Sequence, residues 1–241
     1  MTVHAPLKPP RPLATVIFDV DGVILRSPHE QAWGEALDGF ADPKRFTTEI
    51  YQAEVAGKPR LDGARAALKA VGVTDADKQA KAYAEHKQAR LEALIHAGAV
   101  KPFPDALRFI EAIAALGWPI AVASASKNAN DMMRPLKLPS GTPLLKAFAV
   151  NVCGLDVRRG KPDPEIFLAA AHALGAAPQT CLVVEDAPAG VKAALAGGMA
   201  ALGVARLHDK ALLHKADLVV TSLDEIDIDA LAAGQLLAVA V

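Results

Sequence analysis

Short apolar runs recur along the chain, separated by stretches in which apolar residues return with helical spacing. The runs predict β-strands at residues 14–20, 119–124, 147–152, 180–185 and 200–204, with a weaker one at 218–221. The helical stretches between them cover residues 105–116, 128–136, 164–174 and 189–196. Strands that alternate with helices are typical of a parallel sheet with helices on both faces, so the pattern predicts an α/β fold.

A long helical segment interrupts this alternation between the first and second predicted strands. Residues 28–101 show only helical patterns, at 29–40, 43–55, 63–71 and 75–96. A single crossover does not need so much chain, so we expect a separate all-α domain inserted after the first strand. The prediction divides the chain into a proline-rich leader at 1–13, an α/β core built from 14–27 and 102–241, and a helical insertion at 28–101.

The composition supports a globular protein with a sizeable core. Of the 241 residues, 52% are hydrophobic and 22% are charged, while aromatic residues make up only 5%, a balance that favours packed helices over a β-sandwich. The net charge of -1 offers no basic surface to nucleic acid or to an anionic membrane. No apolar run approaches the ~20 residues that a membrane-spanning helix needs. We therefore expect no nucleic-acid partner and no membrane insertion.

The cysteines and the leader bear on where the protein works. Cys153 and Cys181 lie in apolar, strand-like runs, which predicts reduced core residues rather than a disulfide or a metal pair. The leader carries prolines and basic residues and lacks the apolar core of a signal peptide. We therefore expect a cytoplasmic protein, and we expect it to be a monomer.

Two aspartates stand at the end of the first predicted strand. Asp19 and Asp21 follow an apolar run and precede Gly22, and their spacing places both on one side of the strand. Open α/β sheets bind ligands outside the carboxyl ends of their strands, which is where these side chains would lie. Neighbouring carboxylates repel each other and need a cation, a shared proton or a chemical task. An ordinary Asp-Gly turn at a strand end is the alternative.

Polar residues also follow three later strands. The segment 124–128, Ser-Ala-Ser-Lys-Asn, offers hydroxyl and backbone N–H groups that suit a phosphate, and equally an ordinary helix cap. Lys161 lies on a stiff turn, from which its ammonium group could reach a phosphate or Asp19; a solvated turn lysine is the alternative. Glu185 and Asp186 end the fourth strand. Four carboxylates at one sheet edge are costly in a structural protein, and a hard divalent cation such as Mg²⁺ explains them.

Taken in order, these segments resemble the four motifs of the haloacid dehalogenase-like superfamily. The matching segments are Asp19-Val20-Asp21-Gly22-Val23, the strand that ends in Ser124, the stretch 160–164 (Gly-Lys-Pro-Asp-Pro) and Glu185-Asp186. The resemblance covers residues 14–223, nearly the whole chain. It implies a Rossmann-like core with a helical cap inserted after the first motif, which agrees with the organisation predicted from the hydrophobic pattern.

The resemblance implies a role for each matching residue. Asp19 would be the nucleophile that takes the phosphoryl group as an aspartyl phosphate, and Asp21 the general acid and base. Ser124 and Lys161 would bind the transferring phosphoryl group. The implied ligands of Mg²⁺ are the Asp19 carboxylate, the backbone carbonyl at Asp21, and Asp186, with Glu185 nearby. Asp21 argues against true dehalogenation, because relatives that cleave carbon–halogen bonds generally lack this acid.

Within the superfamily, the chain resembles the β-phosphoglucomutase-like subfamily. The subfamily's second motif is similar to residues 124–128, which implies that Ala125, Ser126, Lys127 and Asn128 contact the substrate. Residues 57–63, Gly-Lys-Pro-Arg-Leu-Asp-Gly, resemble its substrate-specificity loop. There Arg60 would grip the non-transferring phosphate of the substrate. A turn between helices with a solvated arginine is the alternative.

Three further residues match the subfamily within the predicted helical cap. His29 and Trp33 fit an H-x-x-x-W pattern in the first cap helix, where the histidine would assist Asp21. Lys87 aligns, after a one-residue shift, with a cap lysine that faces the site. An ordinary surface lysine fits the same position in the sequence.

The linker between core and cap departs from the subfamily. Residues 25–28, Leu-Arg-Ser-Pro, replace a longer threonine–aspartate–threonine stretch, and Pro28 would stiffen this hinge. Cap closure decides whether an aspartyl phosphate reacts with a sugar hydroxyl or with water. The resemblance therefore implies an enzyme that acts on a small phosphosugar, either a mutase converting β-glucose 1-phosphate to glucose 6-phosphate or a phosphatase for a sugar or polyol phosphate. A non-catalytic protein is disfavoured, because Asp19, Asp21, Lys161 and Asp186 are all present.

Overall fold

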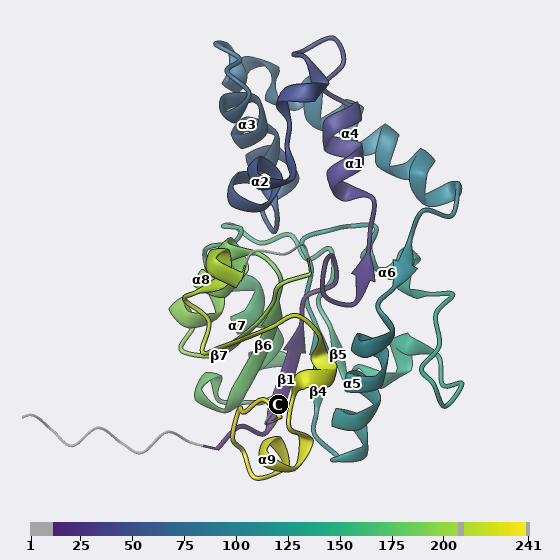
Figure 1. Ribbon diagram of the computed structural model, residues 1–241, viewed down its shortest axis with the longest axis vertical. Helices are drawn as coiled ribbons and strands as arrows, with labels where there is room; N and C mark the ends of the chain where they lie inside the picture. Colours follow the sequence, from purple (N-terminus) through teal and green to yellow (C-terminus); the bar gives the residue numbers. More distant parts are fainter. Residues whose placement is uncertain (1–11, 207–209, 240–241) are drawn as a thin grey trace, which may run out of the picture.

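A six-stranded parallel sheet forms the centre of the computed structural model, which describes residues 12–206 and 210–239 (Figure 1). The strand order is β5 (Val150–Asn151), β4 (Ile120–Val122), β1 (Thr15–Phe18), β6 (Cys181–Glu185), β7 (Ala200–Val204) and β8 (Leu218–Val220). Val16 of β1 pairs with Ile120 on one side and with Leu182 on the other. The carboxyl ends of β1, β4 and β6 therefore lie side by side where the strand order changes direction, which is the usual ligand site of such sheets.

Helices cover both faces of the sheet. On one face lie α5 (Pro104–Ala115), α6 (Ala129–Met133) and α9 (Ile228–Ala232), and on the other lie α7 (Glu165–Ala173) and α8 (Pro188–Ala196). In β1 the side chains of Val16 and Phe18 enter the first layer and that of Ile17 enters the second. Because both faces of the central strands are buried, these strands are largely apolar, and Glu185 stands at the carboxyl end of β6. The predicted α/β fold is confirmed.

Further helices form a layer beyond the carboxyl ends of the strands (Figure 1). They are α1 (His29–Glu35), α2 (Thr48–Ile50), α3 (Arg60–Ala70) and α4 (Ala76–His96). The layer has its own apolar core, which includes Trp33, Leu37, Leu68 and Tyr83, and the Tyr83 hydroxyl donates to the Trp33 carbonyl at 2.7 Å. This separate core supports our proposal that residues 28–101 are a cap domain.

Two short strands connect the cap to the sheet. β2 (Leu25–Arg26) and β3 (Lys101–Pro102) pair antiparallel, and the sequence pattern did not predict them. Phe103 follows β3, and the guanidinium of Arg206 lies over its ring, 4.1 Å from the centroid. Arg206 also donates to the Val23 carbonyl at 3.1 Å and forms a buried ion pair with Asp105 at 2.5 Å. Both linkers are thus held to the core by one arginine.

The predicted helix at 43–55 is wrong as a single element. The segment consists of a 3₁₀ turn at Pro43–Arg45, then α2, then a π-helical turn at Tyr51–Val55. The Asp42 side chain accepts a hydrogen bond from the Lys44 amide, and the Thr47 side chain accepts one from the Ile50 amide. These local caps start two separate turns and so divide the segment.

Other boundaries differ by a few residues. The helix predicted at 29–40 ends at Glu35, after which the chain turns through Gly39, with φ at +83°. The helix predicted at 128–136 is the shorter α6. The strand predicted from residue 147 begins at Val150, because a 3₁₀ turn occupies Leu144–Ala147.

The cysteines and the chain ends complete the fold. Cys181 is buried and Cys153 is half-buried, and both are free thiols. Residues 1–11 of the predicted leader and residues 240–241 lie outside the described residues. Leu236 packs against the sheet, and the Leu237 carbonyl accepts a hydrogen bond from the Asp227 amide at 3.0 Å. No helix in the described part of the chain combines the length and the apolar character that crossing a membrane requires.

Candidate active site

Three carboxylates meet at the carboxyl ends of the central strands. Asp19 follows β1, Glu185 ends β6 and Asp186 follows it, and each offers an oxygen within 4.8 Å of the others. Asp19 is 6% exposed and Glu185 is fully buried. The Asp19 amide donates to the Val184 carbonyl at 3.1 Å, so the pairing of β1 with β6 is what brings the carboxylates together.

Lys161 places a positive charge inside this acidic cluster. Its Nζ donates hydrogen bonds to Asp19 Oδ1 at 2.6 Å and to Glu185 Oε1, and the residue is 4% exposed. Burial opposes the charge of Lys161, but Asp19 and Glu185 outweigh burial and hold its pKa above the usual lysine range. One ammonium group beside three carboxylates leaves the cluster short of positive charge.

The carboxylates themselves are disfavoured in their charged forms. Burial raises the pKa of Asp19 to about 8, against the opposing charge of Lys161. Burial, together with the charges of Glu185 and Asp19, raises the pKa of Asp186 well above its usual value. A divalent cation would reverse both shifts, because it stabilises the ionised oxygens. The donors are all oxygens, so the residues present fit Mg²⁺.

Two glycines leave room for the acidic cluster. A Cβ on Gly22 would collide with the Asp186 carboxylate, and the φ of Gly22 is +81°, which other residues rarely adopt. A Cβ on Gly190, in α8, would collide with the carboxylate of Glu185. Glu185 is fixed further by hydrogen bonds from the amides of Asp186 and Ala187, at 2.9 and 3.1 Å. The two glycines therefore have a steric role in the site.

Asp21 faces two side chains from the cap. Its Oδ1 is buried without a hydrogen-bond partner among the described residues and lies 3.5 Å from His29 Nε2, which likewise has none there. His29 Nδ1 accepts a hydrogen bond from Lys87 Nζ at 2.8 Å. Because Nδ1 accepts, we assign the proton of neutral His29 to Nε2, which faces Asp21. Burial lowers the pKa of His29 to about 4 and that of Lys87 to about 7.

The loop after β4 presents hydroxyl groups to the same space. Ser124 is 3% exposed, and its Oγ accepts a hydrogen bond from the Ser126 amide at 3.1 Å. The Ser126 Oγ accepts one from the Asn128 amide at 3.3 Å. Asn128 precedes α6 but its side chain does not cap that helix; instead its Oδ1 accepts a hydrogen bond from Gln88 of the cap at 3.4 Å. An ordinary cap therefore does not explain Asn128.

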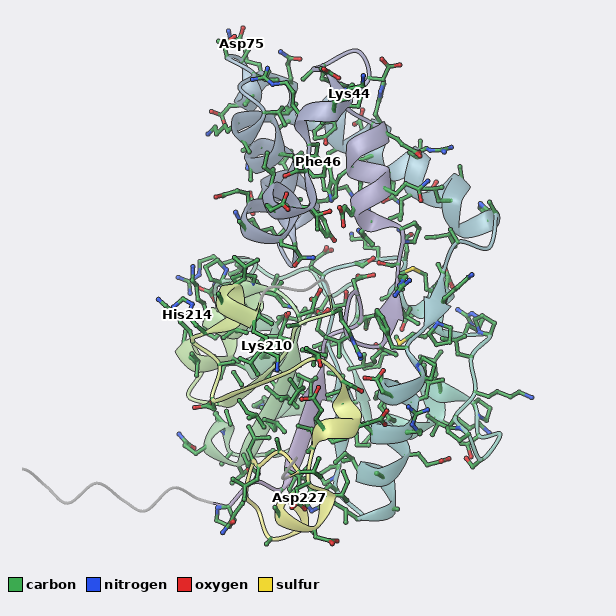
Figure 2. The ribbon with its side chains drawn as sticks, viewed as in Figure 1. Lys44, Phe46, Asp75, Lys210, His214 and Asp227 are labelled. Atoms are coloured by element: carbon green, nitrogen blue, oxygen red, sulfur yellow. The ribbon has the colours of Figure 1, made fainter. Side chains whose placement is uncertain are left out.

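A cavity of about 550 Å³ lies between cap and core. Figure 2 marks the two ends of the molecule, with Asp75 on the cap and Asp227 on the core, and the cavity lies between them. Apart from the buried Glu185, every candidate residue from the sequence lines the cavity: Asp19, Asp21, His29, Arg60, Lys87, Ser124, Ala125, Ser126, Lys127, Asn128, Lys161 and Asp186. Arg60, in the first turn of α3, adds a charge that lowers the pKa of both His29 and Lys87.

The cavity also contains residues that the sequence did not single out. Tyr51 lies in the π-helical turn after α2, and burial with the charges of Asp186 and Asp21 raises the pKa of its hydroxyl. Lys81 and Gln88 line the wall that α4 provides. Their seven-residue spacing places them on one helix face, a signal that was present in the sequence.

Known proteins resemble the chain over most of its length. A family model for haloacid dehalogenase-like hydrolases matches residues 13–198. The β-phosphoglucomutase of Mycobacterium bovis is 32% identical over 248 residues, which cover 90% of this chain and 92% of that protein. Hexitol phosphatase A of Escherichia coli is 32% identical over 215 residues, which cover 88% of this chain and 92% of that protein. A mutase and a phosphatase are thus similar to the chain at the same level of identity.

A solved structure resembles the chain over both of its parts. The archaeal β-phosphoglucomutase from Pyrococcus sp. strain ST 04 matches with a TM-score of 0.72 and 30% sequence identity, and the match covers 91% of this chain and 99% of that one. The similarity therefore includes both the sheet and the helical cap.

Proposed function

The chain belongs to the haloacid dehalogenase-like hydrolase family, and on that basis we propose that it is a Mg²⁺-dependent enzyme that moves a phosphoryl group from a small phosphosugar to Asp19 and then to an acceptor. The observation that carries the proposal is the position of Asp19. It lines the cavity, Lys161 holds its Oδ1 at 2.6 Å, and Glu185 and Asp186 lie beside it. Relatives named as a phosphoglucomutase and a hexitol phosphatase support a sugar or polyol phosphate as the substrate.

In the first step, the Asp19 carboxylate attacks the phosphorus of the substrate. A bond forms between Asp19 and phosphorus, the bond between phosphorus and the sugar oxygen breaks, and Asp21 gives its proton to that oxygen. Lys161 and the Ser124 hydroxyl stabilise the charge on the phosphoryl oxygens. In the second step, Asp21 takes the proton of an acceptor hydroxyl, whose oxygen bonds to phosphorus and frees Asp19.

The acidic cluster explains the need for a metal in this reaction. The residues that would hold Mg²⁺ are Asp19 and Asp186, with Glu185 nearby, and the resemblance to the family adds the backbone carbonyl at Asp21. The bound ion would offset the repulsion between the attacking carboxylate and the phosphate.

His29 and Lys87 support the acid–base role of Asp21. The Nε2–H of His29 points toward Asp21 Oδ1, and the hydrogen bond from Lys87 keeps the ring in that orientation. Both residues belong to cap helices, so Asp21 has this support only when the cap lies over the core.

We propose that the enzyme isomerises β-glucose 1-phosphate to glucose 6-phosphate through a bisphosphate. Such a reaction needs a second phosphate site opposite Asp19. Arg60 lines the cavity from the cap, and Ser126, Lys127 and Asn128 line it from the core. A guanidinium group binds phosphate through two parallel hydrogen bonds, which suits Arg60 to this task. The proposed site is built from one chain, so it needs no second copy.

A phosphatase for a sugar or polyol phosphate is the second candidate. It is favoured by the short linker that ends in Pro28, since a stiffer hinge would close the cap less completely over the aspartyl phosphate. The similarity to hexitol phosphatase A points the same way.

One assay separates the two candidates. The purified chain is given Mg²⁺, β-glucose 1-phosphate and a trace of glucose 1,6-bisphosphate, and glucose 6-phosphate and free phosphate are followed together. Rapid formation of glucose 6-phosphate with little free phosphate supports the mutase. Free phosphate without isomerisation identifies a phosphatase. If the chain forms neither glucose 6-phosphate nor free phosphate from this substrate, and releases no phosphate from a panel of sugar and polyol phosphates, the proposal is refuted.

A further inference from the structure

Two Gly-Lys-Pro segments, one in the cap and one in the core, lie against each other. They are residues 57–59, before α3, and residues 160–162, before α7. A Cβ placed on Gly160 would fall on the Cγ and Cδ atoms of the Pro59 ring. A Cβ on Gly57 would lie 3.6 Å from Lys161 Cδ and 3.5 Å from Ala187 Cβ. Each glycine therefore permits a close approach between the cap and the core.

The two glycines differ in their backbones. Gly57 has φ at +75°, a backbone conformation that residues with a side chain rarely adopt, so a glycine is also required there by the turn itself. Gly160 has no such φ, and an alanine there meets no backbone strain. What an alanine would meet is the proline ring of the cap. Gly160 is thus a position where one methyl group would push cap and core apart without disturbing the local chain.

The contact lies directly beside the reacting groups. Lys161 follows Gly160 in the chain and holds Asp19, and Gly57 lies over the Lys161 side chain. The loop at 56–59 therefore closes the cavity on the side of Asp19. Water that reaches an aspartyl phosphate there competes with the sugar hydroxyl.

We propose that the Pro59–Gly160 contact is the latch that selects the acceptor of the phosphoryl group. With the latch seated, the sugar hydroxyl oxygen bonds to phosphorus, the bond from Asp19 to phosphorus breaks, and Asp21 takes the proton. With the latch displaced, water takes the place of the hydroxyl and inorganic phosphate leaves. The inference rests on the proposed phosphoryl transfer through Asp19 and assigns a specificity role to Gly160, which touches no substrate.

Alanine substitutions on both sides of the contact test the latch. Gly160→Ala should raise the ratio of free phosphate to glucose 6-phosphate by about 5- to 150-fold, the range that overpacking costs produce. Pro59→Ala removes the ring atoms that the new methyl group would strike and leaves Cβ, which would lie 3.3 Å from that methyl group. The double variant should therefore return the ratio most of the way to the wild-type value. Gly34→Ala is the control, since a Cβ there has only an ordinary contact of 3.6 Å with Phe46.

A structural readout accompanies the kinetic one. Small-angle X-ray scattering of the Mg²⁺-loaded proteins should give a larger radius of gyration for Gly160→Ala than for wild type, Gly34→Ala or the double variant. A radius unchanged by Gly160→Ala overturns the latch whatever the substrate is. Two kinetic results also overturn it while leaving phosphoryl transfer intact: an unchanged product ratio in Gly160→Ala, or a wild-type enzyme that releases only phosphate. A wild-type enzyme with no activity refutes the proposed function, and the latch falls with it because it rests on that function; the radius then shows only whether the Pro59–Gly160 contact sets the position of the cap.

Discussion

Replacing Lys161 with methionine tests how the acidic cluster is held together. The change keeps an unbranched side chain, one atom shorter than lysine, and removes the ammonium group that Asp19 and Glu185 share. Both carboxylates then remain buried without their partner, and breaking a buried ion pair in this way costs about 3–5 kcal/mol. In a domain of this size each kcal/mol lowers the melting temperature by about 2–4 °C, so a fall of roughly 6–20 °C is expected without Mg²⁺.

Mg²⁺ should restore much of the lost stability of Lys161→Met. The ion would meet the carboxylates without a competing ammonium group, so it should raise the melting temperature of the variant more than that of wild type. Turnover should still fall by about 10²-fold or more, because the phosphoryl oxygens lose a cationic partner. Thermal denaturation with EDTA and with Mg²⁺ measures both effects. Lys192→Met, at an exposed position on α8, is the control and should change stability by less than about 0.5 kcal/mol. An unchanged melting temperature in EDTA, or a smaller Mg²⁺ shift than in wild type, would show that Lys161 does not hold the acidic cluster together.

Other variants test the remaining assignments. Asp21→Asn should lower turnover by about 10²–10⁴-fold, and near-normal rates would remove Asp21 from the acid–base role. Arg60→Ala should impair bisphosphate-dependent isomerisation far more than hydrolysis of a small aryl phosphate; equal losses would contradict a second phosphate site. Asp105→Asn should lower the free energy of unfolding, measured with urea at pH 7, by about 3–5 kcal/mol, because the buried Arg206 loses its partner. Burial opposes the charge of Asp105, but Arg206 and the Leu223 amide hold its pKa below the usual value. The carboxylate therefore stabilises the fold above its unfolded pKa of about 3.9. The difference in the free energy of unfolding between wild type and Asp105→Asn should narrow as pH falls below that value, and a constant difference would argue against the ion pair.

The sheet and its reactive edge were predictable because local sequence determines them. Residues 14–20 and 180–185 are apolar on both faces, which is the pattern of a buried parallel strand. Parallel strands end at the same edge, so the charged residues that follow them had to lie near one another. Asp19 and Glu185 do so, and the pairing of β1 with β6 is the physical cause.

The cap was less predictable because its details depend on contacts between distant segments. Lys87 fits a surface lysine by sequence, yet it is 3% exposed, since α4 packs it against Trp33 and His29. The contact of Pro59 with Gly160 joins residues far apart in the chain and leaves no local pattern. The division of residues 43–55 into separate turns does have a local cause in the sequence. The capping residues Asp42 and Thr47 indicate it, but the helical spacing of the apolar residues favoured one continuous helix.

The most direct test of the account is to find the residue that carries the phosphoryl group. The enzyme is mixed with Mg²⁺ and glucose 1,6-bisphosphate, quenched in acid during turnover, and digested for mass spectrometry. Transfer through Asp19 predicts a phosphoryl group on the peptide that contains Asp19, and none on that peptide from Asp19→Asn, which should also be inactive. A phosphoryl group on another residue, or turnover by Asp19→Asn near the wild-type rate, would contradict it.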